Sequence, residues 1–367
     1  MVKFFKLIKL FFFILKYKNP IFFVYNNNLK EIDFSKLLYI KKKKHLIIYK
    51  SKPAYNQGLI NYNKYNEKIL CTNSFFLFIF LTIIKSTKTN ILFVSQPYYA
   101  LAFLFSCRNF FLYAYDIHKG LLDISRFKVF AEFIVIIFFK KFIHRDLRLF
   151  ISYKKIIKNK TNIFIPDFIF QKKIKQNKFI KKDSKKLLCA LLGWIDDKNV
   201  TAFKSIKKLC ELKVHVDIFI SGNTLKHIEQ KIQSMQNLYP QYINIKKDLY
   251  GKKLEAELNK CHFGLCPHDK SKPAISNNYR KYCSSARVIE YLKSKLVIFL
   301  SDKATYQNFI IRKYNGTKFS IKYLHKIKKS SALVNLAQKK KNYDIKTKSN
   351  IFNEKYLSRN LYNFLKN

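Results

Sequence analysis

Glycine and proline are scarce in this chain of 367 residues, which has seven of each. That scarcity excludes collagen-like repeats and the low-complexity chains that are rich in these two residues. Acidic residues are also few: 22 Asp and Glu stand against 72 Lys and Arg, which gives a formal net charge of +50 at pH 7. Hydrophobic residues still make up 49% of the sequence. This is enough to build buried cores, so a disordered chain is excluded.

Arginine is rare among the basic residues, since the chain has 8 Arg and 64 Lys. A protein that reads base edges is expected to concentrate arginine, because its guanidinium group makes bidentate contacts. We therefore expect no nucleic-acid partner. Lysine is accompanied by abundant Phe, Tyr, Ile and Asn, the residues that AT-rich codons specify. Two interpretations of the charge stay open: compositional drift on a solvated surface, or a surface that also binds anionic membrane.

The seven cysteines form no Cys-x-x-Cys pair, and most lie in apolar runs, which is typical of buried thiols in a reducing compartment. Cys261 and Cys266 lie close to His262 and His268, and these residue types also occur in metal sites. The segment is interpreted as a buried strand that continues into a loop, so alternate residues face opposite ways. We expect no metal site and no bound cofactor.

No apolar run reaches the ~20 residues that a membrane-spanning helix needs. Residues 69–84 are free of charge over 16 positions, and we interpret them as a buried helix. Residues 1–20 have a basic start and a short apolar core but no small-residue cleavage site, so no cleaved signal peptide is expected. We expect a cytoplasmic protein that lies peripherally on the inner face of the cell membrane, with its Lys- and Phe-rich N-terminus as the contact.

Short apolar runs alternate with longer amphipathic segments, a pattern typical of parallel sheets covered by helices. The expected strands are residues 21–25, 45–49, 91–95, 110–115, 149–152, 162–165, 187–192, 214–221, 242–245, 263–266 and 296–300. The expected helices are residues 200–212, 225–238, 251–260, 285–293 and 353–365.

The pattern restarts after the Lys-rich residues 171–186, which predicts two α/β domains. We place one Rossmann-like domain at residues 1–180 and a second Rossmann-like domain at residues 181–345. Residues 346–367 would form a C-terminal helix that packs back on the first domain. Ligands of such sheets bind outside the carboxyl ends of the strands, so the loops after the strands of the second half are the first place to look for a site.

The most informative segment covers residues 263–300. It predicts a strand that ends at Pro267, a polar loop, a helix that Ser284 or Ser285 can cap, and a second buried strand. Arg287 falls in the first turn of the helix and Glu290 one turn later, on the same face. A surface ion pair between these two side chains is one interpretation, and a ligand site is the other.

This segment resembles the nucleotide-sugar glycosyltransferases of the GT-B type, of family 4 or group 1. Arg287 takes the basic place of their motif, Glu290-Tyr291-Leu292 its acidic-aromatic place, and residues 295–298 the strand that follows. The resemblance implies two Rossmann-like domains that face each other across a cleft, with residues 1–180 as the acceptor-side domain and residues 181–345 as the nucleotide-sugar donor domain. It also implies that Glu290 holds the ribose hydroxyls of the donor, and that Ser284, Ser285 and Arg287 belong to the donor site.

Two further segments carry the resemblance. Residues 187–200 are similar to the element that opens the donor domain: Gly193 would let the backbone approach the phosphates. Lys198 matches a lysine that neutralises the leaving diphosphate without a metal. Residues 115–119 are similar to a strand end whose histidine lies near the reacting sugar, which makes His118 a catalytic candidate. A polar loop histidine is the alternative. Ser152-Tyr153-Lys154 resembles the strand end that precedes the turn at residues 165–168.

Three positions depart from the family's pattern. Tyr282 stands in place of the first of two paired glutamates, Trp194 in place of an arginine, and Asn26-Asn27-Asn28 in place of a glycine-rich loop. The leading hypothesis is a metal-independent glycosyltransferase that moves a sugar from a nucleotide-diphosphate donor to a lipid-linked or polysaccharide acceptor in surface glycan or lipopolysaccharide synthesis. The resemblance suggests a retaining reaction. The alternative is an inactive scaffold or partner subunit of the same shape.

Overall fold

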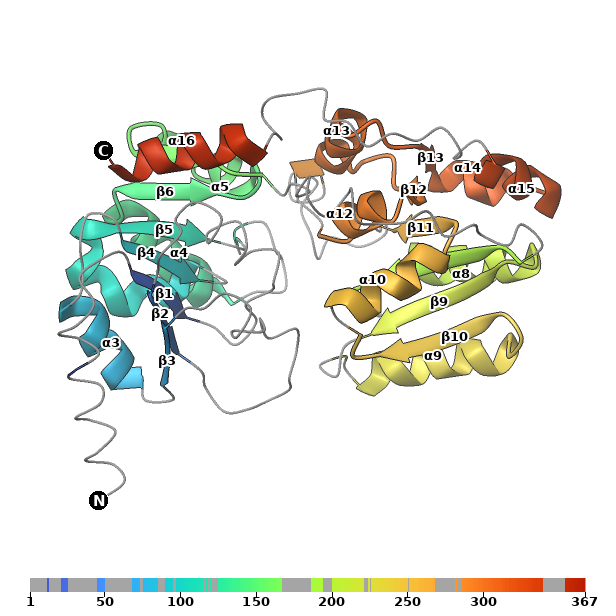
Figure 1. Ribbon diagram of the computed structural model, residues 1–367, viewed down its shortest axis with the longest axis horizontal. Coiled ribbons are helices and arrows are strands. Elements are labelled where there is room, and N and C mark those ends of the chain that lie inside the picture. Colours follow the sequence, from blue (N-terminus) through green and yellow to red (C-terminus); the bar gives the residue numbers. More distant parts are fainter. Residues whose placement is uncertain are drawn as a thin grey trace, which may run out of the picture. The chain divides into compact units, whose positions relative to one another are not determined.

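The chain forms two compact units (Figure 1), Met1–Ile165 together with Ser358–Asn367 as unit 1, and Pro166–Leu357 as unit 2. The computed structural model describes residue 12 and residues 21–25, 45–49, 68–72, 75–84, 90–94, 97–114, 117, 119, 125–166, 186–193, 200–220, 224, 226–249, 251–267, 281–282, 286–338 and 354–366. The domain junction expected at residues 180/181 lies outside the described residues.

Unit 1 is built on a seven-stranded parallel sheet in the order β3-β2-β1-β4-β5-β6-β7. Its strands are β1 (Ile21–Tyr25), β2 (His45–Tyr49), β3 (Lys68–Thr72), β4 (Asn90–Val94), β5 (Phe110–Ala114), β6 (Lys141–His144) and β7 (Thr161–Phe164). Its helices are α3 (Phe75–Ile84), the 3₁₀ helix η2 (Pro97–Asn109), α4 (Arg126–Phe138), α5 (Arg148–Ser152), α6 (Lys154–Ile157) and α16 (Glu354–Lys366). The chain order of the strands reverses between β1 and β4.

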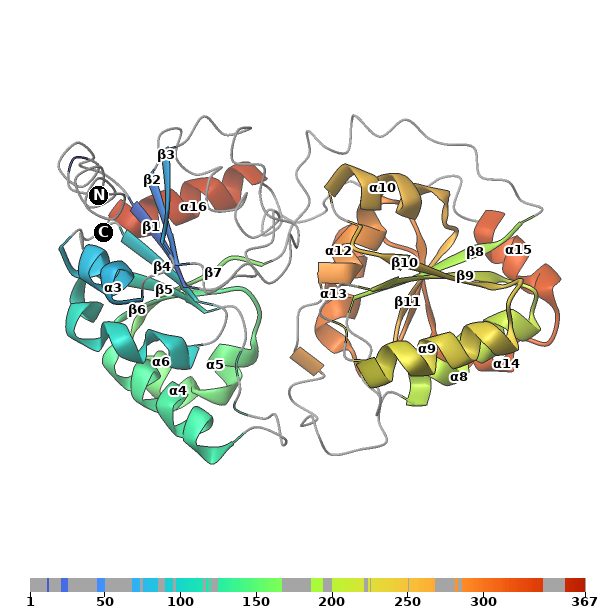
Figure 2. The same cartoon turned by 90° about the horizontal axis from the view of Figure 1, so that it is seen from below.

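Both faces of this sheet are covered. Alternate residues of a strand face opposite sides, and in β5 the side chains of Phe110 and Leu112 join the core that includes Phe78 of α3. On the other face, the ring of Phe111 lies 5.1 Å from the ring of Phe364 in α16, measured between centroids. Figure 2 shows α3 and α4 on one side of the sheet and α16 on the other.

Unit 2 repeats the architecture with six parallel strands in the order β10-β9-β8-β11-β12-β13. Its strands are β8 (Leu188–Leu192), β9 (His215–Ile220), β10 (Ile243–Lys247), β11 (Phe263–Cys266), β12 (Val297–Leu300) and β13 (Lys318–Ser320). Its helices are α8 (Val200–Glu211), α9 (Lys226–Leu238), α10 (Gly251–Lys260), α12 (Ala286–Lys293), α13 (Thr305–Lys313), α14 (Ile321–Lys326) and α15 (Ser330–Gln338). The strand order reverses between β8 and β11.

Every residue of β11 and β12 is buried. Such continuous apolar strands are typical of parallel sheets that helices cover on both faces, and Figure 2 shows α8 and α9 on one face of this sheet and α10 and α12 on the other. The exception among the central strands is Asp217 of β9, which is buried. Lys246 of β10 neutralises it, with 2.7 Å between Nζ and Oδ2. A buried carboxylate needs such a partner.

Most elements expected from the sequence are confirmed to within two residues, and β1, β2, β11 and α10 have the expected bounds. The strand expected at residues 149–152 is wrong, because this segment forms α5. The uncharged stretch 69–84 is not one helix: it contains most of β3 and all of α3. β6 and β13 were not expected; both are short and begin with lysine. None of the described helices has the length and apolar character needed to cross a membrane.

Candidate functional site

The carboxyl ends of β8 and β11 meet where the strand order of unit 2 reverses. In open α/β sheets this switch point is where ligands bind, because the connections on its two sides diverge to opposite faces and leave room. Gly193 directly follows β8 and Pro267 directly follows β11. The next described helix, α12, carries the Arg287 and Glu290 that sequence analysis selected.

Tyr291 fixes α12 against this switch point. Its hydroxyl oxygen accepts a hydrogen bond from the Leu192 N–H at 2.8 Å, and the hydroxyl lies 3.1 Å from the Ala190 carbonyl oxygen and 3.3 Å from that of Leu265. Burial raises the pKa of Tyr291 well above its ordinary value, so the phenol stays protonated and available as a donor. A single side chain thereby holds α12 at the carboxyl ends of both β8 and β11.

The same tyrosine explains a glycine in the middle of β11. A Cβ atom on Gly264 would lie 2.4 Å from Cδ2 of Tyr291, a distance that no side chain tolerates. The absence of a side chain at Gly264 therefore lets the ring of Tyr291 lie flat on the strand. Sequence analysis did not attach a role to either residue.

Arg287 covers the carboxyl end of β8. Gly193 has a φ of +91°, and a Cβ atom built on it would lie 3.4 Å from Nη2 of Arg287 and 3.8 Å from Cζ. The guanidinium group therefore lies directly over the backbone of Gly193. Burial raises the pKa of the Cys266 thiol to about 12, and the positive charge of Arg287 opposes this effect. Arg287 thus places its charge close to the ends of both β8 and β11, as an anion site requires.

Glu290 lies half-buried one turn further along α12, and its Oε1 forms an ion pair with Nζ of Lys293 at 2.6 Å. The ion pair with Arg287 that the sequence left open is therefore replaced by a pair on the opposite side of Glu290. Both partners stand three residues away, so spacing alone does not choose between them.

Four of the site residues expected from the sequence lie outside the described residues: His118, Lys198, Ser284 and Ser285. Trp194 lies outside them as well. Tyr282 is described, and the ammonium group of Lys281 lies 5.3 Å from the centroid of its ring. The structure thus brings Gly193 together with Arg287 and places Glu290 on the same helix as Arg287.

In unit 1 Ser152-Tyr153-Lys154 does not follow a strand, because the strand expected at residues 149–152 is α5. The strand that precedes β7 is β6, which ends at His144, whereas Ser152 ends α5. Tyr153 instead donates a hydrogen bond to Oε1 of the fully buried Glu132 at 2.6 Å, and the same oxygen accepts one from the Lys119 N–H at 3.1 Å. Glu132 therefore anchors the residue that directly follows His118 in the chain.

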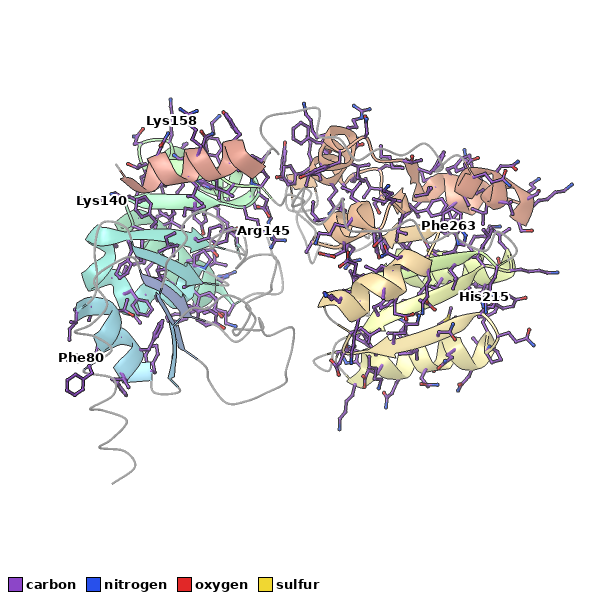
Figure 3. All side chains as sticks on the ribbon, in the orientation of Figure 1. Phe80, Lys140, Arg145, Lys158, His215 and Phe263 are labelled. Carbon is purple, nitrogen blue, oxygen red and sulfur yellow. The ribbon has the colours of Figure 1, made fainter. Side chains whose placement is uncertain are left out.

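A group of buried polar side chains lies at the carboxyl end of β6, and sequence analysis missed it. The group consists of His144, Arg145, Asp146 and Arg148, all buried. Figure 3 labels Arg145 at the carboxyl end of β6. Arg148 forms an ion pair with Asp146, with 2.7 Å between Nη2 and Oδ2.

His144 is the unusual member of this group. Neither of its ring nitrogens has a hydrogen-bond partner among the described residues. Burial lowers its pKa from 6.5 to about 4, although Asp146 raises it. The imidazole is therefore neutral at pH 7. The signal in the sequence was four polar residues among five, His144 to Arg148, directly after the apolar pair Phe142-Ile143.

No protein-family model matches the sequence, and no curated protein is detectably similar to it. Solved structures do match the fold. HepE from Anabaena, solved with UDP, has a TM-score of 0.60 at 8% identity, over 94% of this chain and 99% of that protein. The HepE complex with UDP-glucose gives 0.61, again at 8% identity.

Two further solved structures cover nearly all of the chain. A glycosyltransferase from Rickettsia africae has a TM-score of 0.61 at 11% identity, over 95% of this chain and 98% of that one. Sucrose-phosphate synthase from Thermosynechococcus elongatus has a TM-score of 0.57 at 7% identity, over 95% and 94%. The chain therefore has the GT-B fold, two Rossmann-like domains, as the resemblance in its sequence implied. At these identities the likeness shows the fold alone.

Proposed function

We propose that this protein is a glycosyltransferase that takes a sugar from a nucleotide-diphosphate donor bound to unit 2. The observation that carries the proposal is the position of Arg287 over Gly193 at the switch point between β8 and β11. A guanidinium group at this point suits a diphosphate, because it offers charge-assisted hydrogen bonds to two oxygens at once. The binding of UDP and UDP-glucose by HepE, which has the same fold, supports this donor class.

Each residue of the proposed site has a chemical task. Glu290 accepts hydrogen bonds from the ribose hydroxyls, and Gly193 allows the diphosphate to approach the backbone. Arg287, Lys198 and the N-terminus of α12, at Ser284 and Ser285, neutralise the diphosphate. His118 lies near the reacting sugar. In this arrangement cations of the protein replace a metal ion, so the reaction is metal-independent.

The proposed reaction is a substitution at the anomeric carbon of the donor sugar. A hydroxyl oxygen of the acceptor forms the new glycosidic bond and passes its proton to the departing diphosphate. The bond between the anomeric carbon and the diphosphate oxygen breaks, and the nucleoside diphosphate leaves with the electron pair. Arg287 and Lys198 stabilise the negative charge that develops on this leaving group, which lowers the barrier to bond cleavage. The proposed outcome retains the anomeric configuration.

We propose a lipid-linked or polysaccharide acceptor in surface glycan synthesis, and a peripheral position on the inner face of the cell membrane. The excess of basic residues supports this setting, because it attracts both anionic lipid and phosphorylated acceptors.

Thermal-shift measurements with UDP, GDP and CMP test the donor site, each with and without EDTA. We expect one nucleotide to raise the melting temperature of the wild-type protein, with the shift unchanged by EDTA and lost in Glu290→Ala. Glu229→Ala is the matched control, since Glu229 is an acid on α9 that pairs with Lys247 and should keep the shift. A shift that survives Glu290→Ala would place the ribose elsewhere.

The alternative is an inactive scaffold with the GT-B fold, and Tyr282 is the observation in its favour. The position that should supply a carboxylate holds an aromatic ring in contact with Lys281. A scaffold that has lost its donor site would show no shift with any of the three nucleotides.

A further inference from the structure

The outward face of α3 carries large apolar side chains where a helix on a soluble domain carries polar ones. Phe76 is 83% exposed and Phe80 is 57% exposed. Ile83 and Ile84 continue the same stripe, because residues four, seven and eight positions apart lie on one side of a helix. The opposite side is packed: Phe78 is fully buried and belongs to the core. No residue of α3 is charged.

The outward face of α4 has the same character. Phe127 is 74% exposed and Phe130 is 59% exposed. Phe133, Ile137 and Phe138 are exposed further along the helix. The inward side of α4 buries Val135 and Ile136 in the core of unit 1. Both helices therefore carry large apolar side chains on two faces, and among the described residues the inner face lies in the core while the outer face is exposed.

These two exposed stripes belong to one layer of unit 1. α3 and α4 both pack against η2 and contribute to the same core, and Figure 2 shows them on the same side of the sheet. Residues 97–104 of η2, which lie between them in the chain, include no charged residue. We call the exposed residues together the α3–α4 face: Phe76, Phe80, Ile83, Ile84, Phe127, Phe130, Phe133, Ile137 and Phe138. Figure 3 labels Phe80 on it.

Among the residues that the structure describes, the exposed charges around the α3–α4 face have one sign. Glu132 and Asp146 are the acidic side chains that the structure describes between residues 75 and 166, and both are buried. Arg126, Lys128 and Lys140, in contrast, are exposed in α4 and just after it. An apolar surface rimmed by basic residues fits the boundary between acyl chains and anionic headgroups, where aromatic rings insert and Lys and Arg bind phosphate.

We propose that the α3–α4 face is the membrane-docking surface of this protein, and that its partner is a leaflet that contains anionic phospholipid. The inference rests on the peripheral membrane setting proposed above and names the surface responsible. The proposed membrane contact therefore differs from the N-terminal contact expected from the sequence. Those N-terminal residues lie outside the described residues, except for Phe12. Exposed aromatic area on this scale on a soluble domain marks an interaction site, and the basic rim selects lipid over a second copy of this equally basic chain.

Vesicle co-sedimentation of the full chain tests the proposal, with vesicles of phosphatidylcholine alone and of phosphatidylcholine with phosphatidylglycerol. We expect tight binding only to the anionic vesicles. The double variant Phe76→Ser, Phe130→Ser should lose at least about tenfold in affinity. The variant Arg126→Glu, Lys140→Glu should lose affinity and salt dependence together. Leu238→Ser with Tyr323→Ser removes exposed apolar side chains from unit 2 and should bind as the wild type does.

A UDP thermal shift on the same variants separates the two proposals. A variant that keeps the shift is folded with its donor site intact, so its loss of vesicle binding is a loss of docking. Vesicle binding without a thermal shift from UDP, GDP or CMP would refute the proposed donor site and would leave the docking proposal supported. Anionic vesicles that bind the Phe76→Ser, Phe130→Ser variant as well as the wild type would overturn the docking proposal. The docking proposal would also be overturned if the wild type did not bind vesicles and formed dimers through the α3–α4 face, as measured by light scattering.

Discussion

The guanidinium group of Arg287 lies over the backbone of Gly193, so near that a methyl group on this glycine would be 3.4 Å from Nη2. The two residues are far apart in the chain and meet because Tyr291, one turn after Arg287, is hydrogen-bonded to β8, the strand that Gly193 directly follows. A positive charge is thereby held at the switch point of a Rossmann-like domain, where a nucleotide is expected to bind.

Gly193→Ala should weaken donor binding more than the addition of one methyl group suggests. The φ of +91° is a conformation that L side chains rarely adopt, and holding alanine there costs about 1–3 kcal/mol. The new methyl group also lies in contact with the guanidinium of Arg287 and takes up the space through which the diphosphate would approach the backbone of Gly193. We expect a lower urea midpoint together with a lower affinity for UDP. Asn315→Ala, at another residue with positive φ, should lower the midpoint and leave the affinity unchanged; equal affinities in both variants would contradict the contact.

Tyr291→Phe should destabilise unit 2 although it removes a single oxygen atom. The change leaves the Leu192 N–H without the acceptor that it has at 2.8 Å. This hydrogen bond is partly buried, and leaving a buried backbone donor without an acceptor costs about 1–3 kcal/mol. The urea midpoint is the measurement, with Tyr323→Phe as the control because Tyr323 is exposed on α14. A Tyr291→Phe variant as stable as this control would mean that the hydroxyl does not hold α12 on the sheet.

Acid should destabilise unit 1 through His144. Burial lowers the pKa of this imidazole from 6.5 to about 4, so below about pH 6.5 the unfolded chain binds a proton that the folded protein excludes. This contribution to the free energy of unfolding is fully present above about pH 6.5. It is lost as the pH falls towards 4, by about 3 kcal/mol in total.

His144→Phe removes that proton site, and it removes two buried nitrogens without partners among the described residues. We expect equal or greater stability at pH 7 and a flatter decline between pH 6.5 and 4, measured by urea unfolding at several pH values. His227→Gln, at an exposed histidine on α9, should keep the wild-type slope. An unchanged slope in His144→Phe would refute the assignment.

The sequence predicted the strands that are buried on both faces, because their apolar runs end at abrupt polar or proline positions. β11 is the clearest case: it is wholly buried and ends at Cys266, directly before Pro267. The same reasoning failed at residues 149–152, where a short apolar run forms α5. Periodicity cannot separate a strand from a helical turn over so few residues. Because residues 149–152 were predicted to be a strand, β6 and the buried group His144, Arg145, Asp146 and Arg148 at its carboxyl end were missed.

At the candidate site the sequence predicted which residues matter and not how they pair. It selected Gly193, Arg287 and Glu290, and the structure places the first two in contact. It could not choose between Arg287 and Lys293 as the partner of Glu290, since both stand three residues away. It also interpreted the stretch that contains α3 as buried. Composition shows that a helix is apolar, but only the packing shows that one of its faces is left exposed.

The measurement that most directly tests the central claim is titration calorimetry of UDP with wild type and Arg287→Gln. Glutamine keeps much of the length of the side chain and removes its charge. We predict that the wild type binds UDP in the presence of EDTA and that Arg287→Gln binds at least about tenfold more weakly, which corresponds to about 1.4 kcal/mol. Lys207→Gln, an exposed cation on α8 that pairs with Glu211, should bind as the wild type does. Equal affinities for UDP in Arg287→Gln and wild type would contradict a diphosphate site at this end of β8 and β11.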